Sequence, residues 1–229
     1  YVYLVKWRDA RGRRNEIVVL GKGAHTPDCF PEKIRPQLEE TLARMSTSYV
    51  DIYCLHRDNE SVPVEDFIDT LNELKDEGLL TVFGASNWSL ERFKAANDYA
   101  LSNNKQPFTV LSNNFSLARM NNPVWPGCFS CSEDDYVNYL TENQIAIFPW
   151  SSQARGFFLD SQEFTGAAHV ADPNKEEQDR VWGSEDNFER RNRCLQLAKE
   201  KSVDPIQVAL AFVLNQPFPC LLYTSPSPR

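Results

Sequence analysis

Apolar, β-prone runs alternate with amphipathic segments along this 229-residue chain. In the amphipathic segments apolar residues recur at helical spacing, as Ile34, Leu38, Leu42 and Met45 do. Continuous apolar runs are typical of parallel strands that helices cover on both faces. The pattern therefore predicts strands at 16–23, 50–55, 79–86, 108–114 and 145–152, and helices at 1–10, 31–46, 63–78, 89–104, 132–144, 187–202 and 204–216.

Polar groups close the predicted strands, and these closing groups recur at intervals of about 30 residues, the length of one unit when eight βα units share about 250 residues. The spacing favours a (β/α)8 TIM barrel, with a doubly wound open sheet as the alternative. In both folds ligands bind at the carboxyl ends of the strands. The closing groups are Lys22, His56, Ser86, Ser112–Asn113 and Trp150–Ser151.

Composition narrows the class of protein. Hydrophobic residues make up 41% and charged residues 24% of the chain, which is ordinary for a globular protein. The net charge of −8 argues against nucleic acid as a partner, and no apolar run is long enough for a membrane span. Six scattered cysteines indicate reduced thiols, so we expect a cytoplasmic protein.

Lys22 and His56 are the strongest catalytic candidates, because each ends an apolar strand of the proposed fold. An ammonium and an imidazole N–H aimed at one oxygen suit carbonyl chemistry, in which negative charge develops on that oxygen. The structural alternatives are a solvated strand end for the lysine and a surface or core histidine.

Two further strand ends carry candidate binding groups. In "GASNWS" (84–89) the Ser and Asn are neutral hydrogen-bonding groups for an amide or a hydroxyl; the segment does not match the nucleophile elbow G-x-S-x-G. In "PWSSQARGFF" (149–158) an aromatic ring could stack on a flat ligand, and Arg155 with neighbouring backbone N–H groups could hold phosphate. An ordinary capped turn and a loop around a buried Trp are the structural alternatives.

Two other motifs match known signatures only in part. "GKGAHT" (21–26) lacks the last Gly of the dinucleotide fingerprint, and no helix opens directly after it. Cys128 and Cys131 have C-x-x-C spacing, but a zinc site needs two more ligands and only His25 and Cys29 are at hand. We therefore expect no metal.

Together these segments resemble the aldo-keto reductase family from about residue 10 to residue 219. "IVVLGKGAH" is similar to the strand that bears the family's catalytic lysine, "DIYCLHRDN" to its D-x-Y-x-x-H strand, "FGASNW" to its G-x-S-N segment, and "IFPWSSQARG" to the segment that stacks on nicotinamide. The resemblance implies a NAD(P)H-dependent oxidoreductase that reduces aldehydes or ketones by direct hydride transfer. A small carbonyl compound is then the substrate; the substrate's identity, NADPH against NADH, and the oligomeric state stay open.

The same resemblance implies a role for each candidate. Lys22 and His56 would be catalytic, and Ser86 and Asn87 would hold the nicotinamide carboxamide. Where the family commonly has Gln, this chain reads "LSNNFS", so a further carboxamide contact falls on Ser112 or Asn113. The resemblance places Trp150 against the nicotinamide and Ser151, Gln153 and Arg155 near the phosphates.

The family's proton-donating Tyr and its Asp partner would lie about one βα unit, roughly 30 residues, before Lys22, and Tyr1 and Tyr3 fall in a predicted helix. The last residues, "CLLYTSPSPR", resemble a translated sequencing adapter. We therefore expect domain 1–219 to be a partial barrel without its first strands and its last βα unit, and 220–229 to be a non-native tail. A divergent Ser/Pro-rich natural tail is the alternative.

Such a fragment is expected to be inactive and poorly soluble, because an unclosed barrel exposes strand edges and apolar interior. Two other functions compete with the reductase. One is a non-catalytic NADPH-binding barrel subunit, and the other is a metal-dependent barrel hydrolase that uses His25, His56 and the cysteine pair.

Overall fold

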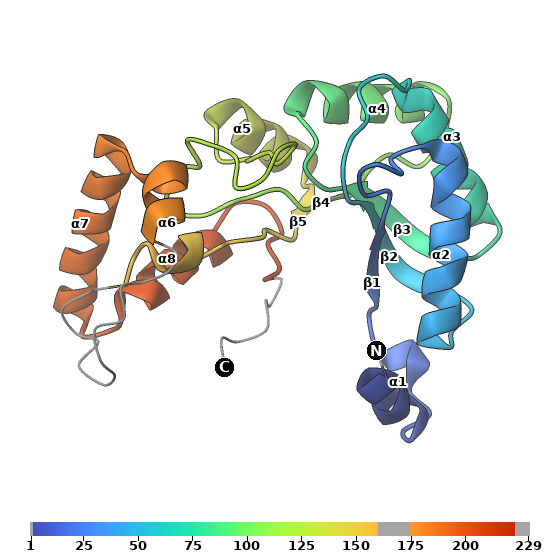
Figure 1. Ribbon diagram of the computed structural model, residues 1–229, viewed down its shortest axis with the longest axis horizontal. Coiled ribbons are helices and arrows are strands. Elements are labelled where there is room, and N and C mark those ends of the chain that lie inside the picture. The colour runs from blue at the N-terminus through green and yellow to red at the C-terminus, as the bar shows by residue number, and fades with distance from the viewer. Residues whose placement is uncertain (1, 160–174, 223–229) are drawn as a thin grey trace. The chain divides into compact units, whose positions relative to one another are not determined.

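The computed structural model describes residues 2–159 and 175–222, and it divides the chain into two compact units, Tyr1–Ser112 and Asn113–Arg229 (Figure 1). The predicted tail at 220–229 lies partly outside the described residues. The assignment of residues 1–219 to one barrel domain stays a prediction.

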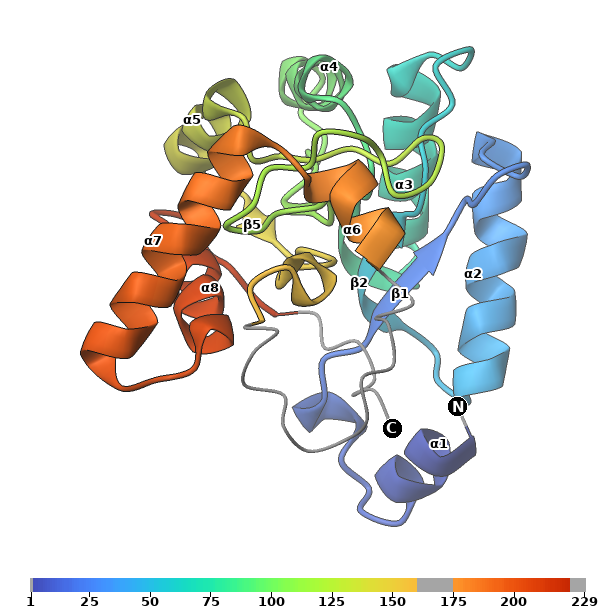
Figure 2. The ribbon, with the colours of Figure 1, turned by 60° about the vertical axis from the view of Figure 1, so that its left-hand side comes forward.

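The first unit alternates helices and strands, as the hydropathy pattern predicts. The four strands are parallel and lie side by side in chain order. Helices α2 and α3 lie beside strands β1 to β3 in both ribbon views (Figures 1 and 2). The elements are α1 (Val2–Asp9), a 3-10 turn (Arg14–Glu16), β1 (Leu20–Gly23), α2 (Pro31–Met45), β2 (Val50–Leu55), α3 (Val64–Asp76), β3 (Leu80–Ala85), α4 (Leu90–Ser102) and β4 (Val110–Leu111).

The helices of this unit begin and end where local chemistry dictates. Ser89, the N-cap of α4, accepts a hydrogen bond from the backbone N–H of Arg92 at 3.2 Å. Gly78, which follows the C-cap residue Glu77 of α3, adopts φ +78°, a conformation that costs glycine little. Aromatic rings then fill the space between helices and sheet, and Trp88 and Phe108 cross edge to face with centroids 5.2 Å apart.

The register of the sheet decides which side chains share a face. Lys22 of β1 pairs with Cys54 of β2. The α-carbons of Gly21 and Gly23 on either side of Lys22 face the ring of Tyr53 and side chains of α2. Because successive strand residues point to opposite faces, Lys22 points away from α2.

A close backbone approach joins β3 to β4. A Cβ atom at Gly84 would lie 1.9 Å from the carbonyl oxygen of Val110. Only glycine therefore allows these two strands to pair at this point.

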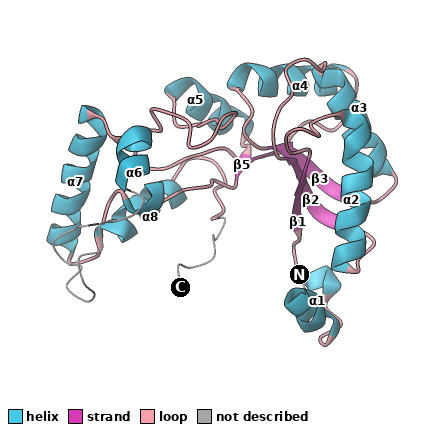
Figure 3. Cartoon of the chain, in the orientation of Figure 1, coloured by secondary structure: helices cyan, strands magenta, loops and turns pink. Residues whose placement is uncertain are grey.

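The second unit contains α5 (Asp134–Asn143), β5 (Ala146–Ile147), a 3-10 turn (Ala154–Gly156), α6 (Lys175–Trp182), α7 (Glu185–Lys201) and α8 (Pro205–Leu214). A long loop connects β4 to α5 (Figure 3). Part of the core of this unit gathers Phe157, Phe158, Val181 and Trp182.

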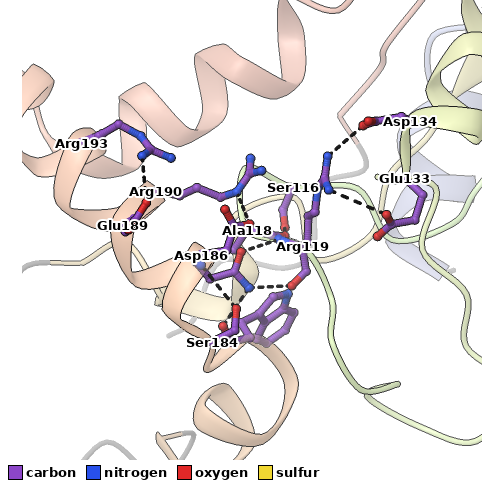
Figure 4. Close-up of polar contacts among 12 residues, drawn as sticks. Ser116, Ala118, Arg119, Glu133, Asp134, Ser184, Asp186, Glu189, Arg190 and Arg193 are labelled. Carbon is purple, nitrogen blue, oxygen red and sulfur yellow. Dashed lines mark hydrogen bonds and ion pairs between the residues drawn. The ribbon is translucent and has the colours of Figure 1, made fainter.

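Polar contacts join the long loop at Arg119 to the start of α7, next to Ser184 (Figure 4). The residue that makes these contacts is a buried asparagine, Asn187. The side chain of Asn187 accepts the N–H of Arg119 at 2.9 Å and donates to the carbonyl oxygens of Arg119 and Trp182 at 2.7 and 2.8 Å. Ser184 caps the same helix by accepting the N–H of Asn187. One amide thus satisfies three backbone groups in an interior where an unpaired group would be costly.

Three predicted strands are much longer than those observed, whereas the predicted strand 79–86 exceeds Leu80–Ala85 by one residue at each end. The predicted strand 16–23 is limited to Leu20–Gly23, because Arg14 bonds the carbonyl of Ile17 and Val18 is 71% exposed. The predicted strands 108–114 and 145–152 shrink to Val110–Leu111 and Ala146–Ile147. Helix α6 lies where the hydropathy pattern predicts no helix.

All six cysteines are free thiols in the structure, five of them buried. Within residues 2–159 and 175–222, no helix has the length and apolar character needed to cross a membrane.

Candidate functional site

Lys22 extends from the end of β1 toward the ends of the next strands. Its ammonium nitrogen donates to the hydroxyl of Ser112 at 2.8 Å and lies 3.5 Å from the hydroxyl of Ser86. The Ser86 hydroxyl in turn donates to the carbonyl oxygen of Ser112 at 2.6 Å. Both serines are almost fully buried, so three predicted site residues form one polar cluster at the carboxyl ends of the sheet.

Burial shapes the acidity of this cluster. Desolvation lowers the pKa of the Lys22 ammonium below its ordinary value, and the positive charge of Arg57 lowers it further, while Cys54 opposes the shift. Burial raises the pKa of the Cys54 thiol to about 11 despite the nearby Lys22. The amine can therefore lose its proton more easily than an exposed lysine.

His56 follows β2 directly, and its main chain continues the pairing with β1. Its backbone N–H donates to the carbonyl oxygen of Gly23 at 2.6 Å. Its ring contacts the ring of His25 edge to face, with centroids 4.6 Å apart. Burial, the charges of Lys22 and Arg57, and His25 lower the pKa of His56 to about 4, so its imidazole is neutral at pH 7 and carries one N–H donor.

Ser86 and Asn87 form the turn after β3. Asn87 adopts φ +58°, a conformation that Asn tolerates better than most residues. Its side-chain amide donates to the hydroxyl of Ser86 at 3.1 Å and to the carbonyl oxygen of His56 at 3.3 Å. The turn that follows β3 is thus bonded to the residue that follows β2.

An ion pair fixes the loop that continues from His56. Arg92 of α4 bonds both carboxylate oxygens of Asp58 at 2.9 Å, and the Asp58 side chain is only 8% exposed. Arg92 also donates to the carbonyl oxygens of Asn59 and Val62. A bidentate, partly buried pair of this kind is more rigid than a surface salt bridge.

The other predicted residues lie in the second unit. Asn113 is fully buried, and its carbonyl oxygen accepts the N–H of Trp150 at 3.3 Å. The side chain of Asn114 bonds the carbonyl oxygen of Trp150 at 3.1 Å. The indole nitrogen of Trp150 is buried and has no hydrogen-bond partner within the described part of the chain.

The turn after Trp150 has an unusual backbone. Four of its residues have positive φ: Ser151, Ala154, Arg155 and Gly156. Surrounding contacts must hold the three that are not glycine in this conformation. The guanidinium of Arg155 bonds Glu177 at 2.5 Å and lies 4.6 Å from the centre of the Trp125 ring, and Gln153 is exposed. The predicted phosphate-binding arginine is thus held by a carboxylate on α6.

The structure therefore brings Lys22, His56, Ser86, Asn87 and Ser112 together in the first unit. In the second unit the backbone of Trp150 is bonded to that of Asn113, and Ser151 and Arg155 lie in the turn that follows Trp150. The functional role of every residue in both sets stays a prediction. Sequence reasoning assigned no role in the reductase site to His25 or Cys54, which adjoin His56 and Lys22; their only signal was their place beside strand ends.

In the first unit, hydroxyl and amide groups lie near the ammonium of Lys22. Such an arrangement can hydrogen-bond a carboxamide or the oxygen of a carbonyl group. Among residues 2–159 and 175–222, no group of three or more His, Cys, Asp and Glu side chains is placed to hold a metal ion.

The model of the aldo/keto reductase family matches residues 3–226 of the chain. The chain is 28% identical over 190 residues to a probable aldo-keto reductase 1 of Glycine max, a match that covers 81% of this chain and 49% of the relative. It is 23% identical over 224 residues to norsolorinic acid reductase A of Aspergillus parasiticus, with 92% and 53% covered.

Among solved structures, an aldo/keto reductase from Klebsiella pneumoniae, in complex with NADP and acetate, matches with a TM-score of 0.62 at 16% identity. That match covers 97% of this chain and 64% of the other. The fold is thus of the predicted α/β class, that of (β/α)8 barrels. The chain spans about half the length of the curated relatives that it matches, and it belongs to the aldo-keto reductase family.

Proposed function

We propose that the protein carrying this chain is an NADPH-dependent reductase of aldehydes or ketones located in the cytoplasm. The observation that carries the proposal is the cluster of Lys22, Ser86 and Ser112 at the strand ends, with His56 directly after β2, the strand that lies between β1 and β3. A small carbonyl compound is its proposed substrate.

NADP(H) is the cofactor of the family, and bound NADPH would supply a hydride to the carbonyl carbon. The donor set fits this cofactor in chemical kind. Ser86 and Asn87, with Ser112 or Asn113, offer hydroxyl and amide groups for the carboxamide. Trp150 offers a ring for stacking, and Ser151, Gln153 and Arg155 offer polar groups for phosphate.

His56 and Lys22 would act on the substrate oxygen. The neutral imidazole of His56 would donate its N–H to that oxygen and orient the carbonyl. The ammonium of Lys22 would stabilise the negative charge that develops there, directly or by lowering the pKa of the proton donor. In the family a Tyr donates that proton. Tyr53 is not a candidate in this chain, because its ring faces α2 rather than the side of the sheet on which Lys22 lies.

The decisive experiment measures kcat/KM for a small aldehyde with the whole protein. Lys22→Met is expected to lower it by about a hundredfold or more, the loss typical when an oxyanion donor is removed. Lys33→Met, an exposed change on α2, is the matched control. Wild-type turnover in Lys22→Met would refute the proposal.

The whole protein is expected to bind NADPH. The binding is measured by fluorescence titration, and Asn87→Ala is expected to weaken it about tenfold, as for the loss of a good hydrogen bond. Binding without turnover in the whole protein would instead support a non-catalytic subunit. Stoichiometric zinc in the purified protein would support the hydrolase.

A further inference from the structure

The turn that follows β1 has a conformation that its own residues do not favour. Ala24 adopts φ +55° and is fully buried. This left-handed region costs an alanine roughly 1 kcal/mol or more relative to glycine. Contacts from elsewhere must therefore hold the turn in place.

A side chain of α2 supplies one of these contacts. The side-chain oxygen of Gln37 accepts the backbone N–H of Ala24 at 2.6 Å. The main chain of Gln37 is part of helix α2, and its main-chain carbonyl oxygen also accepts a hydrogen bond from the hydroxyl of Thr41 at 2.9 Å. The bond thus ties the turn to a rigid element rather than to another loop.

The peptide groups on both sides of Ala24 bind the segment that carries His56. The carbonyl oxygen of Gly23 accepts the N–H of His56 at 2.6 Å, and that of Ala24 accepts the N–H of Arg57 at 3.2 Å. The thiol of Cys29 also donates to the Ala24 carbonyl at 3.1 Å. A rotation of the turn would therefore move His56 relative to Lys22, two residues before Ala24.

Tyr53 closes the other side of the turn. Its ring packs so closely on the α-carbon of Gly23 that an added Cβ atom would lie 1.9 Å from its hydroxyl oxygen and 3.0 Å from the Gln37 side-chain oxygen. The turn is thus enclosed between Gln37 and Tyr53 on the face of the sheet opposite Lys22.

We propose that Gln37 is a positioning residue: by holding the Ala24 amide, it fixes the turn that sets Lys22 and His56 relative to each other. The claim of a catalytic purpose rests on the proposed function. The claim that Gln37 fixes the turn does not, and the two are tested by separate measurements.

The first measurement is amide hydrogen exchange in residues 1–229. Gln37→Met keeps the length of the side chain but removes its strong acceptor. Exchange at the amides of Ala24 and His56 is expected to rise about fivefold to tenfold, while the β2 amides from Ile52 to Cys54 keep their protection. Gln196→Met, on an exposed position of α7, is the matched control and leaves these amides unchanged.

Rescue by a conservative variant separates positioning from general packing. Gln37→Glu retains an acceptor for the Ala24 N–H, so it is expected to restore wild-type exchange and the wild-type chemical shifts of the His56 ring. Unchanged exchange in Gln37→Met, or equal exchange in Gln37→Glu and Gln37→Met, would overturn the proposal.

If Gln37→Met does not fold, it is combined with Ala24→Gly, because glycine adopts this backbone without a steric penalty. The double variant is then compared with Ala24→Gly alone, with the same expectations. In the whole protein, Gln37→Met is expected to lower kcat about tenfold with little change in the KM for NADPH. Normal kcat together with faster exchange would remove the catalytic purpose and leave the proposed reductase function intact.

Discussion

The ammonium nitrogen of Lys22 lies 2.8 Å from the hydroxyl oxygen of Ser112, although 90 residues separate them in the chain. The four strands from β1 to β4 pair in parallel, each with the next. This creates the contact, because it brings the carboxyl ends of the four strands to one edge of the sheet. Burial lowers the pKa of this ammonium, so a lysine at this place is expected to be costly for stability.

Lys22→Met is expected to raise the free energy of unfolding by about 1 kcal/mol at pH 7, because an apolar side chain replaces a desolvated charge. The pKa of Lys22 is lowered in the folded state, so the unfolded chain binds more protons in the window below the ordinary value of 10.5. The wild type therefore gains stability relative to the variant as pH rises through that window. Urea unfolding at several pH values measures this; Lys33→Met, the control, shows no such pH dependence, and a destabilised Lys22→Met would contradict the prediction.

His56 is expected to titrate near pH 4, since burial and the charge of Lys22 lower its pKa to about 4 from 6.5. Between these values the unfolded state binds the extra proton, so stability is lost as pH falls from 6.5 to 4. NMR titration of the ring gives the midpoint directly. His56→Gln is expected to remove the fall in the free energy of unfolding that protonation of His56 causes between pH 6.5 and 4. A midpoint at or above 6 would show that the imidazole is not buried as described.

Gly84→Ala is expected to destabilise the first unit by about 3 kcal/mol, because the new Cβ atom would collide with the carbonyl oxygen of Val110. Gly78→Ala is the matched control. Nothing lies within 4 Å of a Cβ atom there, so only the positive φ is penalised, by about 1 kcal/mol. Thermal unfolding compares the two, and equal losses would mean that β3 and β4 do not approach so closely.

Asn187→Ala is expected to cost about 3 kcal/mol, because it leaves backbone groups of Arg119 and Trp182 unpaired inside the second unit. Asn143→Ala removes a single exposed side-chain bond to Tyr139 and is expected to change stability by less than about 0.5 kcal/mol. Chemical unfolding followed by tryptophan fluorescence, to which the buried Trp182 contributes, measures both; a near-neutral Asn187→Ala would mean that water replaces the amide.

The hydropathy pattern predicts much of the first unit, because its strands are apolar without interruption and its helices have one clear apolar face. It also locates Lys22, His56 and Ser86, since a polar group at the end of such a strand stands out. It misses α6, where only Val181 and Trp182 are buried. A helix of that composition has no visible period, and its fold depends on packing.

Gln37 escapes sequence reasoning for a different reason. On a helix rich in polar residues, a glutamine looks like part of the solvated face, and its bond to Ala24 depends on how α2 lies against β1. Likewise the side chain of Asn114 donates to the carbonyl oxygen of Trp150, a side-chain contact with the main chain that apolar patterning does not register.

The close packing of Tyr53 on Gly23 couples the residues that positions 23 and 53 can accept. Any side chain at residue 23 would overlap the phenol ring, so a larger residue there is tolerated only if residue 53 becomes smaller in the same step. Homologues, or a library randomised at both codons and selected for folding, should therefore show smaller residues at position 53 wherever position 23 is larger than glycine. Single substitutions at residue 23 should be lost from such a library.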